Sequence, residues 1–476
     1  MAVGLILLLE FSTASQVENR VYGSQAVSIS KTFFGLSVVD LGNPLPWPLT
    51  VPLGTLGKTQ GTEWNDVEPS NGTFDWTPLD NSISKAESAG VSSFIYTFWS
   101  TPEWASSAPT QSCILTAIEN TTGCAAPPSK LSYWDAFVQA VVSRYKNQIQ
   151  YYELGNEANL AETYSGNVSE MVTLSQHAYE DVKSIEPSAI VLSPSVSTIG
   201  VAPYTPGCNV AECWLAEYLQ AGGGQYADGI AFHEYAYFST NPTAVRLGIA
   251  CTQGDIEQCA GSPLETVVGD LRSLLSTYGL AGKPIFDTEG GFPSDIISAN
   301  LLGTAAEQAA YVSRWFVVQA SESISVAVWF SEFPTQGGLA GFGTTSAQAE
   351  DNQAYVETYS WLVDSSVTSP CSRSSGLWTC GLTLSDGEPG QIVFADSGNA
   401  SLPYSPSSSY SEVQGLNGTT YPVRGPVNVG IAPVLFTSGP TTTTPEFPGA
   451  SLSMVALVAV GAVAALRFRR LGPPGA

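Results

Sequence analysis

Two glutamates stand directly after short hydrophobic runs that are typical of buried strands. Glu157 ends the sequence Tyr-Tyr-Glu-Leu-Gly-Asn-Glu, and Glu289 lies within Pro-Ile-Phe-Asp-Thr-Glu-Gly-Gly. If both runs are strands of one parallel barrel, both carboxylates lie on the rim where active sites of that fold sit. A protonated and an ionised carboxyl group together can break a glycosidic bond, because the leaving oxygen needs a proton and the anomeric carbon a nucleophile. We therefore expect an acid pair that acts on a sugar.

The chain around these glutamates alternates between strand-like and helix-like patterns. Apolar residues recur at helical spacing in segments such as 131–145 and 168–185. This alternation predicts an α/β fold with a parallel sheet. An open, doubly wound sheet is the alternative, but no glycine-rich phosphate loop follows the first strand, and eight units favour closure into a (β/α)8 TIM barrel. The predicted strands are 33–38, 53–57, 93–97, 149–154, 190–193, 229–233, 284–288 and 326–330.

Near residue 366 the alternation of strand and helix patterns gives way to short β-prone runs separated by Gly, Ser, Pro and Asn. We expect a catalytic barrel over residues 30–365 and a small β-sandwich-like module over 366–437, to which segment 21–29 could add a strand. The module is expected to pack on the side of the barrel. A carbohydrate-binding module is the alternative.

Both ends of the chain carry signals of export. Residues 1–16 begin with an apolar run and resemble a signal peptide, although they lack a basic start. At the other end, a Thr- and Pro-rich linker over 438–449 precedes an apolar run over 450–467 and a basic tail over 468–476. This order predicts a transmembrane helix with a cytoplasmic tail. It also resembles the Pro-Glu-Phe-type carboxyl-terminal sorting signals of archaea and bacteria, which implies a membrane transpeptidase as a partner.

The eight cysteines fall into four pairs that are close in the sequence, and none is left over. Local disulfides fit this spacing better than a metal site, and disulfides persist in oxidising compartments. We therefore expect an extracellular or cell-surface protein with its catalytic domain outside the membrane. The predicted pairs are Cys113 with Cys124, Cys208 with Cys213, Cys251 with Cys259, and Cys371 with Cys380.

The charge balance excludes one class of partner. The chain has 42 Asp and Glu against 17 Lys and Arg, and no basic cluster in its body could follow a phosphate backbone. Nucleic acid is therefore not an expected partner. With only 2 histidines and no unpaired cysteine expected, the sequence predicts neither a catalytic metal nor another cofactor.

Several motifs, in this order, resemble the glycoside hydrolases of clan A, and family 39 and its relatives in family 5 most of all. They are Trp-Asn-Asp-Val-Glu-Pro at 64–69, Gly-Thr-Phe-Asp-Trp at 72–76, Thr-Pro-Glu-Trp-Ala at 101–105, and the two glutamate motifs. The resemblance runs from about residue 33 to residue 330. It implies a TIM barrel with an attached β module and an O-glycosyl hydrolase activity.

The resemblance also implies roles for individual residues. Glu157 matches the general acid/base, Glu289 the nucleophile, and Asn156 the side chain that binds the sugar 2-hydroxyl. His233 and Tyr235 match an element that contacts the nucleophile and the substrate, and Trp329 matches the floor of the central subsite. Departures are Gly155 where Trp is common, Ala158 where Pro is common, and Lys58 near a position that often holds Arg.

Two more aromatic residues follow the third predicted strand. Trp99 and Trp104 could stack on sugar rings, or they could cap the hydrophobic core; the sequence leaves both open. The leading functional hypothesis is a retaining hydrolase of β-linked oligo- or polysaccharides, such as xylan, β-glucan or mannan. A transglycosylase with the same two glutamates and a non-catalytic glycan-binding protein on a barrel scaffold are the alternatives.

Overall fold

The structure is a computed structural model, and the part described here comprises residues 28–39, 51–59, 61–116, 120–197, 210–235, 237–238, 250–251, 262–291, 305–332, 346–395 and 401–439. The predicted signal peptide, the predicted membrane segment, Cys208 and Cys259 lie outside these residues. Within them, no helix has both the length and the apolar character that a membrane crossing requires.

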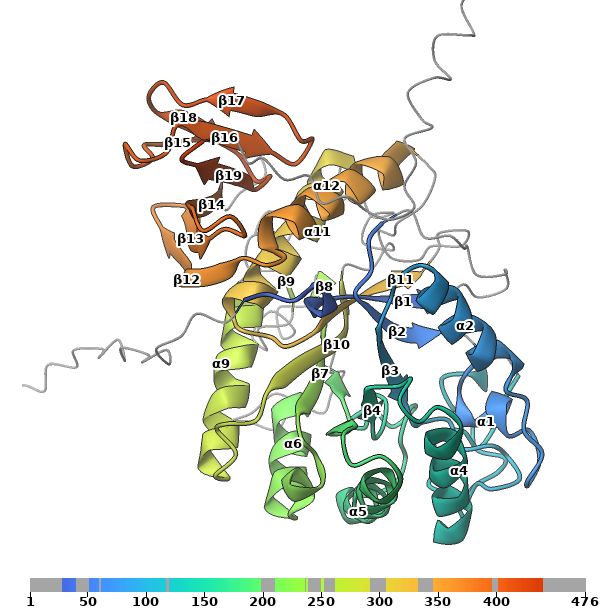
Figure 1. Ribbon diagram of the computed structural model, residues 1–476. Helices are drawn as coiled ribbons and strands as arrows, with labels where there is room; N and C mark the ends of the chain where they lie inside the picture. The colour runs from blue at the N-terminus through green and yellow to red at the C-terminus, as the bar shows by residue number, and fades with distance from the viewer. Residues whose placement is uncertain are drawn as a thin grey trace, which may run out of the picture.

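A curled sheet of nine strands, all parallel to their neighbours, forms the main body (Figure 1). Its two edges, β5 and β6, belong to one stretch of chain, and the backbone N–H of Ser193 donates to the carbonyl of Gly229 beside β7 at 2.9 Å. The sheet therefore curves back on itself as a barrel does. The strands in sheet order are β5 (Ile190–Leu192), β4 (Tyr151–Glu153), β3 (Ser93–Thr97), β2 (Thr55–Thr59), β1 (Phe34–Val39), β11 (Ala327–Glu332), β10 (Ile285–Gly291), β7 (Ile230–Tyr235) and β6 (Val196–Ser197).

Each of the eight predicted strands overlaps a strand of this sheet. β3 has the predicted bounds, whereas β4 is shorter than predicted, and β7, β10 and β11 extend further at their carboxyl ends. The short strand β6 was not predicted. Pro194 lies between β5 and β6, and because proline has no N–H to donate, it interrupts the pairing of this segment.

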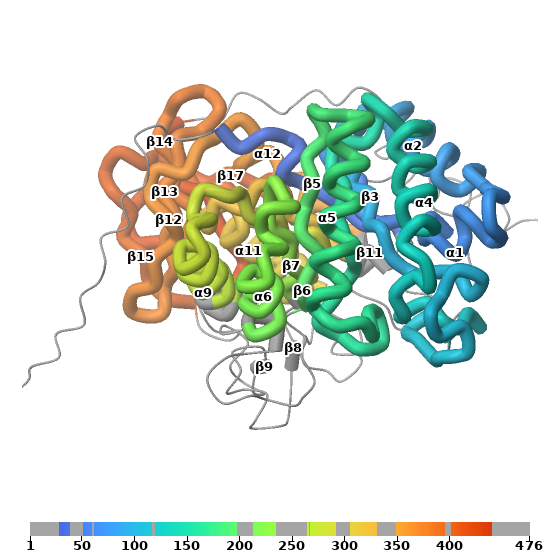
Figure 2. Tube along the Cα trace, turned by 90° about the horizontal axis from the view of Figure 1, so that it is seen from below, coloured from blue at the N-terminus to red at the C-terminus, as the bar shows by residue number. Residues whose placement is uncertain are grey.

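Helices cover the outside of the sheet (Figures 1 and 2). The boundaries follow local chemistry. For example, Asn167 caps α5, its side chain accepting from the backbone of Glu170 while the Glu170 carboxylate accepts from the backbone of Asn167. The helices are α1 (Trp64–Val67), α2 (Thr77–Ser88), α4 (Leu131–Arg144), α5 (Val168–Ile185), α6 (Val210–Gln220), α9 (Ser262–Thr277), α11 (Ala305–Ser321) and α12 (Ser346–Leu362), with 3-10 turns η1 (Lys31–Phe33) and η2 (Gly223–Tyr226).

Two apolar layers stabilise the barrel. Inside the sheet, buried side chains from neighbouring strands form one cluster, including Ile95, Phe286 and Val328. Outside it, aromatic rings fill the space between the sheet and the helices: Phe34 of β1 stacks on Phe316 of α11 with centroids 4.9 Å apart. Strands buried on both faces need continuous apolar sequence, which explains why the barrel strands read as hydrophobic runs.

An antiparallel β domain follows α12 and packs against α11 (Figure 1). The guanidinium of Arg314, on α11, lies 4.8 Å from the ring centroid of Phe394, on β14. The N-terminal segment reaches this domain, since Ser28 bridges to Ser366. One sheet has the order β12 (Ser366–Ser374), β13 (Leu377–Thr383), β14 (Pro389–Ala395), β19 (Val434–Thr437), β16 (Glu412–Gly415) and β17 (Thr420–Pro422), and β15 (Leu402–Tyr404) pairs with β18 (Val427–Val429). A further two-stranded pair, β8 (Tyr237–Phe238) and β9 (Ala250–Cys251), follows β7 in the chain.

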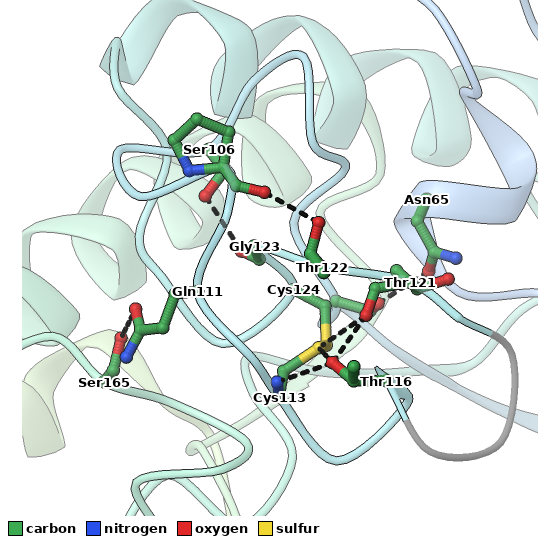
Figure 3. Close-up of a disulfide and its surroundings, with 12 residues drawn as sticks. Asn65, Ser106, Gln111, Cys113, Thr116, Thr121, Thr122, Gly123, Cys124 and Ser165 are labelled. Carbon is green, nitrogen blue, oxygen red and sulfur yellow. Dashed lines mark hydrogen bonds between the residues drawn. A yellow bond between two sulfur atoms is a disulfide. The ribbon is translucent and has the colours of Figure 1, made fainter.

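Two of the predicted cysteine pairs, Cys113 with Cys124 and Cys371 with Cys380, are disulfides in the structure. The first closes a turn in the long loop after β3 (Figure 3). There the Thr116 hydroxyl accepts from the backbone N–H of Cys113 at 2.9 Å and donates to the carbonyl of Thr121 at 2.6 Å. This loop is therefore held by covalent and polar contacts together.

Candidate active site

Polar side chains replace the apolar layer at the carboxyl ends of the strands. Thr97 and Glu153 are paired on β3 and β4, and His233 and Glu289 are paired on β7 and β10. All four are buried, and each lies beyond the apolar cluster inside the barrel. The rim of the barrel thus carries a buried polar layer at the place where barrel enzymes bind substrates.

A β-bulge in β10 determines which way Glu289 points. Asp287 pairs with Phe232 and Glu289 with His233, so Thr288 is an extra residue on β10. In a regular strand Asp287 and Glu289 would share a face, but one extra residue places them on opposite faces. Asp287 accordingly contacts Gln319 on α11, outside the sheet. Glu289 points into the barrel.

A second bulge in β2 turns Lys58 inward. Leu36 pairs with Leu56 and Val38 with Thr59, so two residues of β2, Gly57 and Lys58, face the single residue between the paired positions of β1. The Lys58 ammonium donates to the Glu289 carboxylate and to the side-chain oxygen of Asn156. The two bulges therefore bring Lys58 and Glu289 into contact at the barrel rim.

Glu157 stands in a left-handed backbone conformation, with φ of 44°. Such a conformation is costly for a residue with a side chain and persists only where the surroundings impose it. Here Ser195, between β5 and β6, accepts from the Glu157 backbone N–H through its hydroxyl at 3.1 Å and from the Ala158 N–H through its carbonyl at 2.9 Å. The Thr163 hydroxyl donates to the Glu157 carbonyl at 2.6 Å. These bonds hold the Glu157 turn against the neighbouring strand.

The two glutamates predicted from the sequence come together. One carboxylate oxygen of Glu157, one of Glu289 and a ring nitrogen of His233 all lie within 4.8 Å of one another. His233 Nδ1 lies 3.1 Å from Glu157 Oε1 and 3.8 Å from Glu289 Oε2. The glutamate side chains are 11% and 12% exposed, whereas His233 is fully buried. Both carboxylates thus keep a small exposed surface, whereas the imidazole beside them has none.

Charge in this site is balanced by Lys58 and His233. Burial alone lowers the pKa of Lys58, but the carboxylates of Glu289, Glu153 and Glu157 outweigh it and raise this pKa. Burial likewise lowers the pKa of His233, and Lys58 adds to that effect, but Glu289, Glu153 and Glu157 raise it to about 9. Lys58 and His233 are therefore both cationic near neutral pH.

Asn156 and Trp99 border the acid pair. Because the Asn156 side-chain oxygen accepts from Lys58, its amide N–H groups remain directed toward other partners. Trp99 lines one cavity together with Lys58 and a second one together with Asn156. Of the two tryptophans after β3, Trp99 therefore adjoins the site.

The outcomes for two further predicted site residues, Trp104 and Tyr235, differ from each other. Trp104 donates its indole N–H to the carbonyl of Glu68 at 2.8 Å and packs on Trp64, which is the core-capping alternative. Tyr235 ends β7, where its backbone pairs with Gly291; its side chain is outside the described part of the chain.

Trp329 does not form the expected floor of the site. It is fully buried and packs on Trp315 and Phe316 of α11, with ring centroids 5.4 Å and 6.3 Å away. The reason is strand alternation: Val328 lies in the cluster inside the barrel, so Trp329 faces the helices and Phe330 follows on the inner side.

Glu157, His233 and Glu289 could each offer one ligand atom to a cation. However, the Lys58 ammonium already contacts Glu289, and His233 is held cationic by its neighbours. Two positive groups next to the carboxylates disfavour a third. We therefore interpret the cluster as an acid pair with its charge partners.

Solved structures share this architecture. The chain is similar to a family 39 glycoside hydrolase from Bacteroides cellulosilyticus, with 16% identity, a TM-score of 0.59, and coverage of 85% of this chain and 80% of that one. It is also similar to the catalytic domain of the GH30 xylanase C from Talaromyces cellulolyticus, with 16% identity, a TM-score of 0.54 and coverage of 87% and 97%. A GH39 β-xylosidase from Caulobacter crescentus matches at 16% identity, a TM-score of 0.54 and coverage of 87% and 98%.

The chain has the fold of these glycoside hydrolases. The coverage implies that the similarity spans the barrel and the β domain. By sequence alone no comparison succeeds: no protein-family model matches, and no curated protein matches either.

Three residues of this barrel rim were not predicted as site residues. Lys58 was noted only as a departure from a family pattern, and Glu153 and Ser195 were not among the predicted site residues. Because the chain has only 17 basic residues, a lysine directly after a predicted strand is a signal that could have identified Lys58 as a site residue. The roles of Glu153 and Ser195 depend on contacts with distant segments, which strand patterns do not reveal.

Replacing Lys58 by methionine is expected to lower kcat/KM for the reaction at this acid pair by roughly a hundredfold, an effect typical of removing one charged contact in an active site. Without the ammonium, the Glu289 carboxyl holds its proton to higher pH, so the acidic limb of the pH profile moves upward. The profile is measured for wild type, Lys58→Met and Lys58→Arg. A matched control is Lys183→Met, because Lys183 forms an ion pair with Asp228 at 2.7 Å outside the site. An unchanged acidic limb in Lys58→Met would contradict this role.

Asp287 is predicted to be a neutral carboxylic acid. Burial first, and then the nearby Glu234 carboxylate, raise its pKa well above the ordinary value, against the opposing effects of His233, Gln319 and a backbone N–H. A raised acid pKa means that stability falls as pH rises above the unfolded value of about 3.9. We therefore expect Asp287→Asn to fold. When the pH is raised from about 5 to about 8, its melting temperature should decrease less than that of the wild type.

The comparison variant is Asp80→Asn. Hydrogen bonds from Arg144 lower the pKa of Asp80, so its contribution to stability is present above the unfolded pKa and is lost as pH falls through the folded one. As pH rises, Asp80→Asn should therefore lose stability relative to the wild type. Asp287→Asn should instead gain stability relative to the wild type over the same change in pH. A melting temperature of Asp287→Asn that drops more steeply with rising pH than that of the wild type would show that Asp287 is ionised.

Proposed function

We propose that this protein is a retaining glycoside hydrolase with Glu157 as general acid/base and Glu289 as nucleophile. The observation that carries the proposal is the separation of the two carboxylates, which have oxygens within 4.8 Å at the carboxyl ends of β4 and β10. Retaining enzymes hold their carboxyl groups about 5 to 5.5 Å apart, whereas inverting enzymes need about 6.5 to 9.5 Å to admit a water.

The charged neighbours of the two glutamates support these different roles for Glu289 and Glu157. Lys58 contacts Glu289, which keeps the nucleophile ionised and ready to attack the anomeric carbon. Glu157 contacts His233 and not Lys58 in this arrangement. In the first step Glu157 gives its proton to the leaving oxygen while Glu289 forms the glycosyl-enzyme bond. In the second step Glu157 takes a proton from water, and that water displaces Glu289 with net retention.

The substrate class is proposed from the fold relatives. They include proteins described as a β-xylosidase and a xylanase. We infer a β-linked glycan for this chain, with xylan as the first candidate and β-glucan and mannan next. Trp99, beside Lys58 and Asn156, is the aromatic surface on which a sugar ring could stack.

The test is hydrolysis by the full chain of xylan, β-glucan, mannan and matching aryl β-glycosides, followed by proton NMR of the first product. A β-anomer that appears first and mutarotates later supports retention. Products longer than the substrate would instead indicate transglycosylation by the same residues. An α-anomer first contradicts the retaining mechanism, and release of no sugar from any of these substrates favours the glycan-binding alternative.

We also propose that the protein acts outside the cell and is tethered there by residues 450–467. Two disulfides support an oxidising compartment, and the apolar run followed by basic residues supports the anchor. Fractionation of cells that express the full chain, with and without residues 450–476, tests this. Recovery of both forms in the soluble fraction would contradict a tether.

A further inference from the structure

Glu153 is a third acid of the barrel rim, and the proposed reaction does not use it. It is fully buried on β4, where Tyr151, two residues earlier, packs on the cluster inside the barrel, so Glu153 also points inward. Its Oε2 accepts from the Thr97 hydroxyl at 3.3 Å, and its Oε1 lies 3.7 Å from Nε2 of His233. An ionised carboxylate in such a place is costly unless it has a charged partner.

His233 is that partner, and it lies between two groups of acids. On its Nε2 side is Glu153, and on its Nδ1 side are Glu157 at 3.1 Å and Glu289 at 3.8 Å. Two other charged or titratable groups act on the imidazole, Lys58 from β2 and Asp287 from β10. The 3.7 Å contact is an ion pair rather than a hydrogen bond, since hydrogen bonds of this type are shorter than about 3.2 Å.

We propose that Glu153 is a positioning residue that keeps both ring nitrogens of His233 protonated and turns Nδ1–H toward Glu157. This inference rests on the proposed glycosidase function. The Nδ1–H donates to Oε1 of Glu157, so Oε1 is occupied in both protonation states. The transferable proton of Glu157 is therefore carried by Oε2. In each half-reaction Oε2 loses or regains one proton, and the protons of His233 stay in place.

Two other roles for Glu153 agree less well with the contacts. A direct catalytic acid has to reach the substrate, but Glu153 has no exposed surface and lies on the far side of His233 from Glu157. A purely structural acid would be satisfied by Thr97 and backbone groups, yet one of its oxygens faces the imidazole instead. The ion pair with His233 is what distinguishes the proposed role.

The direct test is nitrogen NMR of the full chain labelled with ¹⁵N-histidine, since the chain has 2 histidines. His177→Gln assigns the signals, because His177 lies on α5 beside Asp135 and is partly exposed. We expect both nitrogens of His233 to be protonated at neutral pH in the wild type. In Glu153→Gln the midpoint of the His233 titration should fall by about one pH unit or more, because an opposite charge next to the ring is removed.

The matched control is Glu186→Gln. Glu186 is also buried, and its carboxylate accepts from the backbone N–H of Asn147. It should leave the His233 midpoint unchanged. If Glu153→Gln does not fold, Glu153→Asp is used, which keeps the charge and should lower the midpoint by a smaller amount. A His233 midpoint that is the same in the wild type and in the folded Glu153 variant overturns the proposal.

A double-mutant cycle measured by kcat distinguishes a positioning role of Glu153 from a packing role. If Glu153 acts through His233, Glu153→Gln lowers kcat at least tenfold in the wild type but has little further effect in a His233→Gln background. Equal losses in both backgrounds indicate a packing role and overturn the proposal. The NMR titration needs no substrate, so it can support the His233 orientation even if the hydrolysis assay shows that the proposed reaction is wrong.

Discussion

The Glu289→Gln variant is expected to lose hydrolysis of every substrate by roughly 10⁴-fold or more, the scale of loss that follows removal of a catalytic nucleophile. An amide oxygen is too weak a nucleophile to form the glycosyl-enzyme bond. The side chain keeps its shape, and its oxygen can still accept from the Lys58 ammonium, which contacts Glu289 in the wild type. We therefore expect the fold and the binding of substrate to persist.

The measurement compares kcat for aryl β-glycosides and for polymer, with thermal unfolding as a check on the fold. Glu186→Gln serves as the control for a buried glutamate changed to an amide, because its contact is with the backbone of Asn147. If Glu289→Gln remained within tenfold of the wild type while folded, Glu289 would not be the nucleophile. A covalent adduct found on Glu289 by mass spectrometry, with a slowly turned-over fluoro-sugar, would support the assignment independently.

Replacing Glu157 by alanine is expected to affect substrates unequally. Loss of the general acid lowers kcat/KM for polymer by roughly 10²- to 10⁴-fold, because the glycosidic oxygen then leaves without a proton. Aryl glycosides with an acidic leaving group need no such proton, so their first step should be nearly unchanged. Their second step then becomes limiting, since no base activates the water.

Azide provides the decisive measurement for Glu157→Ala. A small anion can occupy the space of the missing carboxylate and attack the glycosyl-enzyme without base catalysis. We expect added azide to accelerate turnover of an activated aryl glycoside and to yield a β-glycosyl azide, which has the retained configuration. An equal loss on polymer and on activated substrates, with no effect of azide, would remove Glu157 from the acid/base role.

Much of the fold could be predicted because the relevant signals are local. Each predicted barrel strand overlaps an observed one, and α5 begins and ends at the predicted residues 168 and 185. Its start is encoded by Asn167 and Glu170, which lie three residues apart and cap one another. The change to short β-strands after residue 366 was also predicted.

The sequence by itself determined that Glu157 and Glu289 follow two strands of one parallel sheet, since hydrophobic runs and helical spacing are properties of neighbouring residues. The tertiary structure decided which side chains meet there. The bulges that turn Lys58 and Glu289 inward are defined by pairing with β1 and β7, and the bulge in β10 also sends Asp287 to the helices. A side-chain period of two holds only while the register is regular, and the register depends on a partner strand that is distant in the chain. For the same reason, the charges of Lys58 and His233 follow from acids that only the folded barrel brings beside them.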